Sequence, residues 1–161
     1  MKLLGTPPIN PTMFVIGKVA IFIAWLLPFL QLSGRTIQRT TPGLIPVAAA
    51  LVVAGVLVWV LAFRALGSSA RVGLPTEPTA LKTGGIYRFS RNPIYIGMFL
   101  FTLAACLYCP YVVVISSSII GILIHHKIAL GEESFLEQRF GEEWRKYKAR
   151  TPRYIGFLHE G

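Results

Sequence analysis

The sequence has few charged residues, since Asp, Glu, Lys and Arg together make up only 14% of its 161 residues. Hydrophobic residues account for 53%, and the mean hydropathy is positive. An ordinary soluble domain carries about 25% charged residues, so this composition excludes one. We therefore interpret the chain as an integral membrane protein.

Several common patterns are also missing. The sequence shows no alternating strand pattern, no internal repeat and no low-complexity segment. It has no Ser-His-Asp pattern and no glycine-rich phosphate loop. Its two cysteines, Cys106 and Cys109, form a C-x-x-C with no His or further Cys nearby, so we expect apolar packing, with a redox or metal role as the alternative.

The apolar runs predict the architecture. A membrane span needs roughly 20 apolar residues, and the block from residue 94 to 124 is too long for one helix and is divided by Cys109-Pro110. We expect one all-α membrane domain over residues 1–161, with four transmembrane helices of which the last two form a short hairpin. The predicted spans are about residues 13–33, 44–66, 94–109 and 111–126.

A different composition follows His126. Leu136, Phe140, Trp144 and Tyr147 recur there at helical spacing among charged residues. This pattern predicts a C-terminal amphipathic helix, which by itself would lie on the membrane interface.

The basic residues predict the topology. The net charge is +9, which in a soluble protein would suggest nucleic acid, but here the basic residues flank the spans and fit lipid headgroups. With four spans, thirteen basic residues lie on the same side of the membrane as both termini, and only Arg35 and Arg39 lie on the other side. The positive-inside rule places both termini in the cytoplasm. We expect a multi-pass protein of a bacterial or archaeal inner membrane, with no nucleic-acid partner.

Two polar segments stand beside the expected hairpin. Residues 83–97 (TGGIYRFSRNPIYIG) place Arg91 at the mouth of a span, and an Arg near hydrocarbon is costly unless it finds a partner. Glu132 and Glu133 follow the hairpin, where either can point to the apolar face or act as a helix-start acid. The hairpin brings both segments to one membrane surface.

The side chains of these segments suit a nucleoside-like ligand. Tyr87 and Tyr95 can stack on an adenine or attract a sulfonium by cation–π contact. The amide of Asn92 offers a donor and an acceptor, and a carboxylate can bind ribose hydroxyls or an ammonium group.

Together, G-x-Y-x-x-x-R-N-P-x-Y-x-G and the later E-E-x-x-L-x-x-x-F-G-x-x-W-x-x-Y with Thr-Pro-Arg resemble the isoprenylcysteine carboxyl methyltransferase family and its phospholipid methyltransferase relatives. The match covers about residues 79–154. The resemblance implies a helical, membrane-embedded enzyme that uses S-adenosylmethionine, with this part binding the cofactor. Carried over residue by residue, the implied cofactor contacts are Leu81, Lys82, Tyr87, Asn92, Pro93, Ile94, Tyr95 and Glu132.

Two departures from the family pattern matter. Asn92 stands where the family usually has His, and an amide can donate a hydrogen bond but cannot titrate near neutral pH. Ile128 stands where the prenylcysteine enzymes have an Arg for the substrate carboxylate. Lys127 is beside it, but one residue turns a side chain by about 100° around a helix.

We therefore expect a methyltransferase acting on a membrane lipid or lipidated substrate through a carboxylate, amine or thiol. The candidates for catalysis are Arg91, His126 and Lys127, and no metal is implied. His125 and His126 are expected to pack or lie at the interface, although either could deprotonate an acceptor. The alternatives are a non-catalytic membrane adaptor with a cofactor-like pocket and a lipid-binding scaffold.

Overall fold

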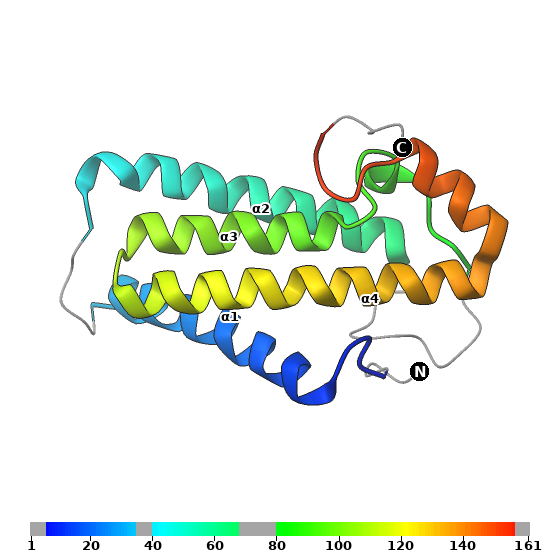
Figure 1. The fold of residues 1–161 in the computed structure, drawn as a ribbon. Helices are drawn as coiled ribbons and strands as arrows, with labels where there is room; N and C mark the ends of the chain where they lie inside the picture. The colour runs from blue at the N-terminus through cyan, green and yellow to red at the C-terminus, as the bar shows by residue number, and fades with distance from the viewer. Residues whose placement is uncertain (1–5, 35–39, 68–79, 157–161) are drawn as a thin grey trace.

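The computed structural model describes residues 6–34, 40–67 and 80–156, and within these ranges its elements are all helical. The elements are α1 (Pro11–Leu32), η1 (Pro42–Leu44), α2 (Ile45–Leu66), η3 (Gly85–Arg88), α3 (Pro93–Tyr108) and α4 (Val112–Arg150). The α-helices lie side by side in an elongated bundle (Figure 1). The all-helical prediction is confirmed.

Local signals explain where the helices begin and end. The side chain of Asn10 caps α1 by accepting from the backbone N–H of Thr12 at 2.9 Å. Proline occupies the first turn of α1, α2 and α3, where no backbone donor is needed. Gly67 ends α2 with a φ of +54°, a conformation that favours glycine.

The helices suit a membrane. Among the described residues, α1, α4 and the segment Pro42–Leu66 are long and apolar enough to cross one, while α3 is a shorter apolar helix of 16 residues. Large apolar side chains such as Phe22, Phe29 and Leu32 are more than 60% exposed, which suits contact with lipid rather than water. The chain is therefore an integral membrane protein, and four crossings stay a proposal because α3 is short.

Close packing of small residues joins the helices in pairs. α2 packs chiefly on α3, and α1 on α4. A Cβ added at Gly97 would overlap the ring of Trp59, so this position has no room for a side chain, and a Cβ at Gly55 would lie only 3.2 Å from the carbonyl oxygen of Gly97. Such contacts let membrane helices approach closely. The Trp59 indole also donates to the carbonyl of Ile94 at 2.9 Å, fixing α2 against the start of α3.

The last helix continues well past the predicted end of its span at residue 126. α4 runs without a break to Phe140, and only at Gly141 (φ +50°, ψ −117°) does its backbone turn. Beyond that turn Trp144 and Tyr147 are buried, at 1% and 2% exposure, against protein rather than in the headgroups as an isolated amphipathic helix would place them. Hydropathy marks where an apolar run ends, which is not where the helix ends.

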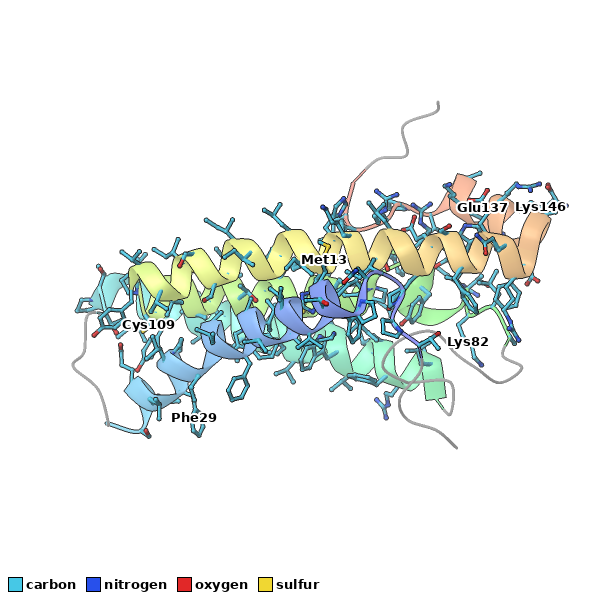
Figure 2. The ribbon with its side chains drawn as sticks, turned by 60° about the horizontal axis from the view of Figure 1, so that its bottom comes forward. Met13, Phe29, Lys82, Cys109, Glu137 and Lys146 are labelled. Atoms are coloured by element: carbon cyan, nitrogen blue, oxygen red, sulfur yellow. The ribbon has the colours of Figure 1, made fainter. Side chains whose placement is uncertain are left out.

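One end of the bundle gathers the polar segments. α1 and α3 begin there and α2 and α4 end there, and we call it the polar end (Figure 1). In Figure 2, Lys82, Glu137 and Lys146 lie toward it, whereas Cys109 and Phe29 lie toward the other end. The described parts of the segments before α3 and after α4 thus lie at the same end of the bundle, as the four-span arrangement predicts. Four basic residues of the topology argument lie outside the described residues: Lys2, Arg35, Arg39 and Arg71.

The two cysteines are free thiols at the end opposite the polar end. Cys109 is fully buried in an apolar cluster with Ala105 and Val114, and the Cys106 thiol donates to the hydroxyl of Ser118 at 3.2 Å. Both cysteine side chains therefore have ordinary packing or hydrogen-bonding contacts within the bundle.

Candidate functional site

The polar stretch before α3 is held by the chain's last segment. Gly85 begins η3 with a φ of +60°, which turns the chain so that Tyr87 is buried. The Tyr147 hydroxyl donates to the carbonyl of Tyr87 at 2.6 Å. Burial raises the pKa of the Tyr87 hydroxyl, which therefore stays protonated at neutral pH.

Glu133 is the centre of a saturated ion-pair network. Its carboxylate is buried and accepts from the Arg91 guanidinium at 3.2 Å, the Asn92 amide at 2.9 Å and both sides of the Arg153 guanidinium at 3.0 and 3.1 Å. Each carboxylate oxygen therefore has two donors. This network ties α4, the start of α3 and the C-terminal segment together.

Backbone hydrogen bonds reinforce this tie. The N–H of Arg91 donates to the carbonyl of Pro152 at 2.9 Å, and the N–H of Asn92 donates to that of Arg153 at 3.2 Å. The Ser90 hydroxyl donates to the same Arg153 carbonyl at 3.0 Å. The Thr-Pro-Arg of the sequence motif thus pairs with the Arg-Asn-Pro motif in space.

Glu132 is placed differently from Glu133. Its carboxylate accepts from the Tyr95 hydroxyl at 3.0 Å through one oxygen, and no donor among the described residues contacts the other oxygen. Glu132 is partly exposed, unlike Glu133. Of the two glutamates, it is therefore Glu132 that can accept hydrogen bonds from a ligand.

A polar pair that we did not predict lies near this carboxylate. Lys18 of α1 and His125 of α4 are joined by a 3.3 Å hydrogen bond between Nζ and Nε2, and His125 Nδ1 contacts the carbonyl of Gly121 at 2.8 Å. Lys18 also interacts electrostatically with Glu132. A lysine within an apolar run was the available signal, because such residues are costly and usually have a partner.

The three candidates for catalysis differ in their surroundings. The Arg91 guanidinium is committed to Glu133 and to the carbonyl of Lys148, with burial lowering its pKa and Glu133 opposing that shift. His126 Nδ1 lies 3.1 Å from the Tyr154 hydroxyl, whose pKa burial raises to about 12. Lys127 is exposed. The structure therefore brings only Arg91 into direct contact with the glutamates.

The other predicted cofactor contacts are spread along the same strip. Pro93 is buried at the first turn of α3, and the carbonyl of Ile94 is occupied by Trp59. Leu81 is half-buried and Lys82 is exposed, just before η3. These residues lie at the polar end, before and after η3 in the chain.

Several polar atoms here would fit a nucleoside-like ligand with an amino-acid part. Glu132 has its free oxygen, and the carbonyl oxygen of the Asn92 side chain accepts nothing from the described residues. Two buried donors, Arg91 Nε and Trp144 Nε1, have no acceptor in the described part of the chain. The Asn92 amide donor, however, is used by Glu133, so this residue offers a ligand only its acceptor.

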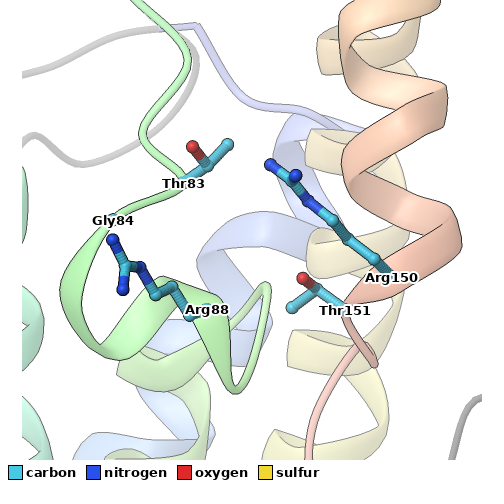
Figure 3. A pocket seen from close by; sticks show the side chains of 5 residues that line it. All are labelled: Thr83, Gly84, Arg88, Arg150 and Thr151. Atoms are coloured by element: carbon cyan, nitrogen blue, oxygen red, sulfur yellow. The ribbon is translucent and has the colours of Figure 1, made fainter.

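A cavity of about 400 Å³ opens at the polar end, beside these residues (Figure 3). It lies between the segment that leads into η3 and the end of α4. The described residues that line it are Thr83, Gly84, Arg88, Arg150 and Thr151. Three of them lie in the polar stretch 83–97 that the sequence indicated, and Thr151 begins the Thr-Pro-Arg motif, but none was predicted as an individual ligand contact.

Comparison with known proteins indicates the family. A family model described as phospholipid methyltransferase matches residues 44–143, well over half of the chain. The matched region runs from the start of α2 to just past the turn at Gly141 and contains the polar stretch and both glutamates. No curated protein and no solved structure matches the chain.

Proposed function

Because the chain belongs to the phospholipid methyltransferase family, which acts on lipid-like substrates, we propose that it transfers a methyl group from S-adenosylmethionine to a lipid-borne acceptor. One observation supports this proposal above the others. The segment from Tyr87 to Tyr95 and the glutamates at 132 and 133, about 40 residues apart, contact each other directly at the end of a membrane bundle.

S-adenosylmethionine, when bound, supplies a methyl group on a sulfonium, so the protein does not need to generate an electrophile. Glu132 would hold the hydroxyl or ammonium donors of this cofactor through its free oxygen, with Tyr95 fixing the carboxylate by its hydrogen bond. Tyr87 is buried at the same end of the bundle, and its hydroxyl stays neutral because burial raises its pKa. These residues are the ones that would orient the cofactor.

Arg91 and Glu133 would act by positioning. Their ion pair, together with Arg153, holds the start of α3 against α4 and so fixes the distance between Tyr95 and Glu132. Positioning is the main contribution that such an enzyme can make, because well-oriented reactants gain several kcal/mol of barrier reduction, up to about 7–11 kcal/mol.

The acceptor would lose a proton if it is an amine or a thiol. His126 is half-buried, and its Nδ1 is bonded to the Tyr154 hydroxyl, which leaves Nε2 to take that proton. We place this acceptor at the membrane surface of the polar end, which the basic residues assign to the cytoplasm.

The test is a transfer assay with methyl-labelled S-adenosylmethionine on membranes that contain the protein. A labelled, solvent-extractable lipid supports the enzyme and identifies the acceptor atom. Cofactor binding without transfer would instead support a membrane adaptor, and the absence of both would leave a lipid-binding scaffold. A Glu142→Gln protein should keep full transfer, because that glutamate is exposed and, among the described residues, pairs with Arg145 alone.

A further inference from the structure

The cavity at the polar end has a cationic lining. Two of its lining residues are arginines: in Figure 3 the Arg150 guanidinium reaches from the end of α4 toward Thr83, and the Arg88 guanidinium lies beside Gly84 on the η3 side. No carboxylate is among its described lining residues. Its volume of about 400 Å³ lies within the usual range of ligand pockets, about 300–1,000 Å³.

These two arginines differ from three other arginines of the polar end. Arg91 and Arg153 pair with Glu133, and Arg145 pairs with Glu142. Within the described ranges, Arg88 and Arg150 form no ion pair. Both side chains are exposed at the cavity, so a bound anion would supply the counter-charge that they lack.

Two hydroxyl groups add neutral donors. Thr83 and Thr151 line the same cavity, and neither side chain makes a hydrogen bond within the described part of the chain. Thr151 is only 2% exposed, so its hydroxyl is held at the cavity wall rather than in bulk solvent. In Figure 3 this hydroxyl points into the space between the two arginines.

The walls of the cavity are cross-linked. η3, which carries Arg88, is bonded to α4 through the Tyr147 hydroxyl and the carbonyl of Tyr87 at 2.6 Å. The Pro152 carbonyl, next to Thr151, accepts from the backbone N–H of Arg91 at 2.9 Å. The backbones that carry the donors are therefore fixed before any ligand arrives, which lowers the entropic cost of binding.

We propose that this cavity binds the phosphate group of a phosphate ester. A phosphate presents several oxygens and a negative charge, which match two guanidinium forks and two hydroxyls better than a carboxylate with two oxygens. The ester is either a phospholipid headgroup at the membrane surface or a soluble phosphate compound. The site does not rest on the proposed methyl transfer, because none of its lining residues is a predicted cofactor contact.

The experiment measures binding to the purified full-length protein in phosphate-free detergent by microscale thermophoresis. The soluble probe is glycerol 3-phosphate. The lipid probe is phosphatidylglycerol in mixed micelles, with diacylglycerol as the matched lipid that lacks phosphate. The variants are Arg88→Gln, Arg150→Gln and Arg88→Lys, with Arg145→Gln as an exposed control on the same segment of α4, and each is checked for an unchanged melting temperature.

We expect Arg88→Gln and Arg150→Gln each to weaken binding of a phosphate probe by about ten- to a hundredfold, the loss typical of one charge-assisted hydrogen bond. Arg88→Lys should weaken binding less, and Arg145→Gln hardly at all. A response to phosphatidylglycerol alone would identify a headgroup site, and a response to glycerol 3-phosphate a site for soluble esters.

Three results would overturn the proposal. The first is equal weakening by Arg145→Gln, which would mean general attraction to surface charge. The second is that neither probe depends on Arg88 or Arg150. The third is displacement of the phosphate probe by S-adenosylhomocysteine, which would make the cavity part of a cofactor site.

Discussion

Glu133 and Glu132 are neighbours in the chain with different surroundings. Glu133 is 6% exposed and is the shared partner of Arg91 and Arg153. Glu133→Gln would leave two guanidinium groups without their counter-charge, and breaking a buried ion pair costs about 3–5 kcal/mol. We expect a correspondingly large loss in the free energy of unfolding, measured by denaturation in detergent.

The control for that measurement is Glu142→Gln. The side chain of Glu142 is 65% exposed and pairs with Arg145 three residues away, so its loss should cost only about 0–1 kcal/mol. Equal losses in the two variants would contradict the assignment of Glu133 as the centre of the network.

Glu132 should affect ligand binding more than stability. Glu132→Gln removes one charge-assisted hydrogen bond to the cofactor, worth about 1.5–3 kcal/mol, and should weaken S-adenosylmethionine binding roughly ten- to a hundredfold in calorimetry. Tyr95→Phe, which removes the donor to Glu132, should weaken binding less. Unchanged affinity in Glu132→Gln would remove the anchor of the proposed cofactor site.

At the scale of the element, the turn in α4 should depend on Gly141. Its φ of +50° with ψ of −117° is a conformation that other residues rarely adopt, and a Cβ there would meet nothing within 4 Å. Gly141→Ala therefore tests backbone strain alone, at about 1–3 kcal/mol. Because the turn carries Tyr147 to the carbonyl of Tyr87, we expect cofactor affinity to fall together with the melting temperature.

Gly43→Ala is the matched control for the turn. A Cβ at Gly43 likewise meets nothing within 4 Å, and its φ is not positive, so its effect should stay within about 0.5 kcal/mol. A Gly141→Ala protein as stable as Gly43→Ala would show that α4 does not need the turn.

At the scale of the whole molecule, the shared end of the helices makes the topology testable. Lys146 lies toward the polar end and Ser33 follows α1 at the other (Figure 2). The basic residues predict a cytoplasmic polar end. In intact cells, an impermeant maleimide should therefore label Ser33→Cys directly and Lys146→Cys only after permeabilisation.

The unsubstituted protein, with Cys106 half-buried and Cys109 buried, gives the background of that labelling. Labelling of both positions from the same side would contradict the four-crossing arrangement, including the passage of the short helix α3.

Features set by local sequence were predicted well. The apolar runs indicate the membrane helices, and Asn92-Pro93 marks the start of α3. A helix was predicted after residue 126, but its unbroken continuity with the last span was not, because polarity changes there while helical backbone bonding does not. The hydrogen bond between Lys18 and His125 was not predicted, because the two residues are more than a hundred positions apart in the chain.

The sequence by itself determined that this protein is helical, lies in a membrane and brings two polar motifs to one end, because hydrophobic length and spacing are local properties. It could not decide which glutamate does what, since Glu132 and Glu133 are equivalent by helical spacing. Only the tertiary structure shows that Glu133 pairs with Arg91 and Arg153, whereas one carboxylate oxygen of Glu132 has no donor among the described residues. That Arg88 and Arg150 line one cavity was also decided by the tertiary structure, because a hydrogen bond between distant segments holds η3 against α4.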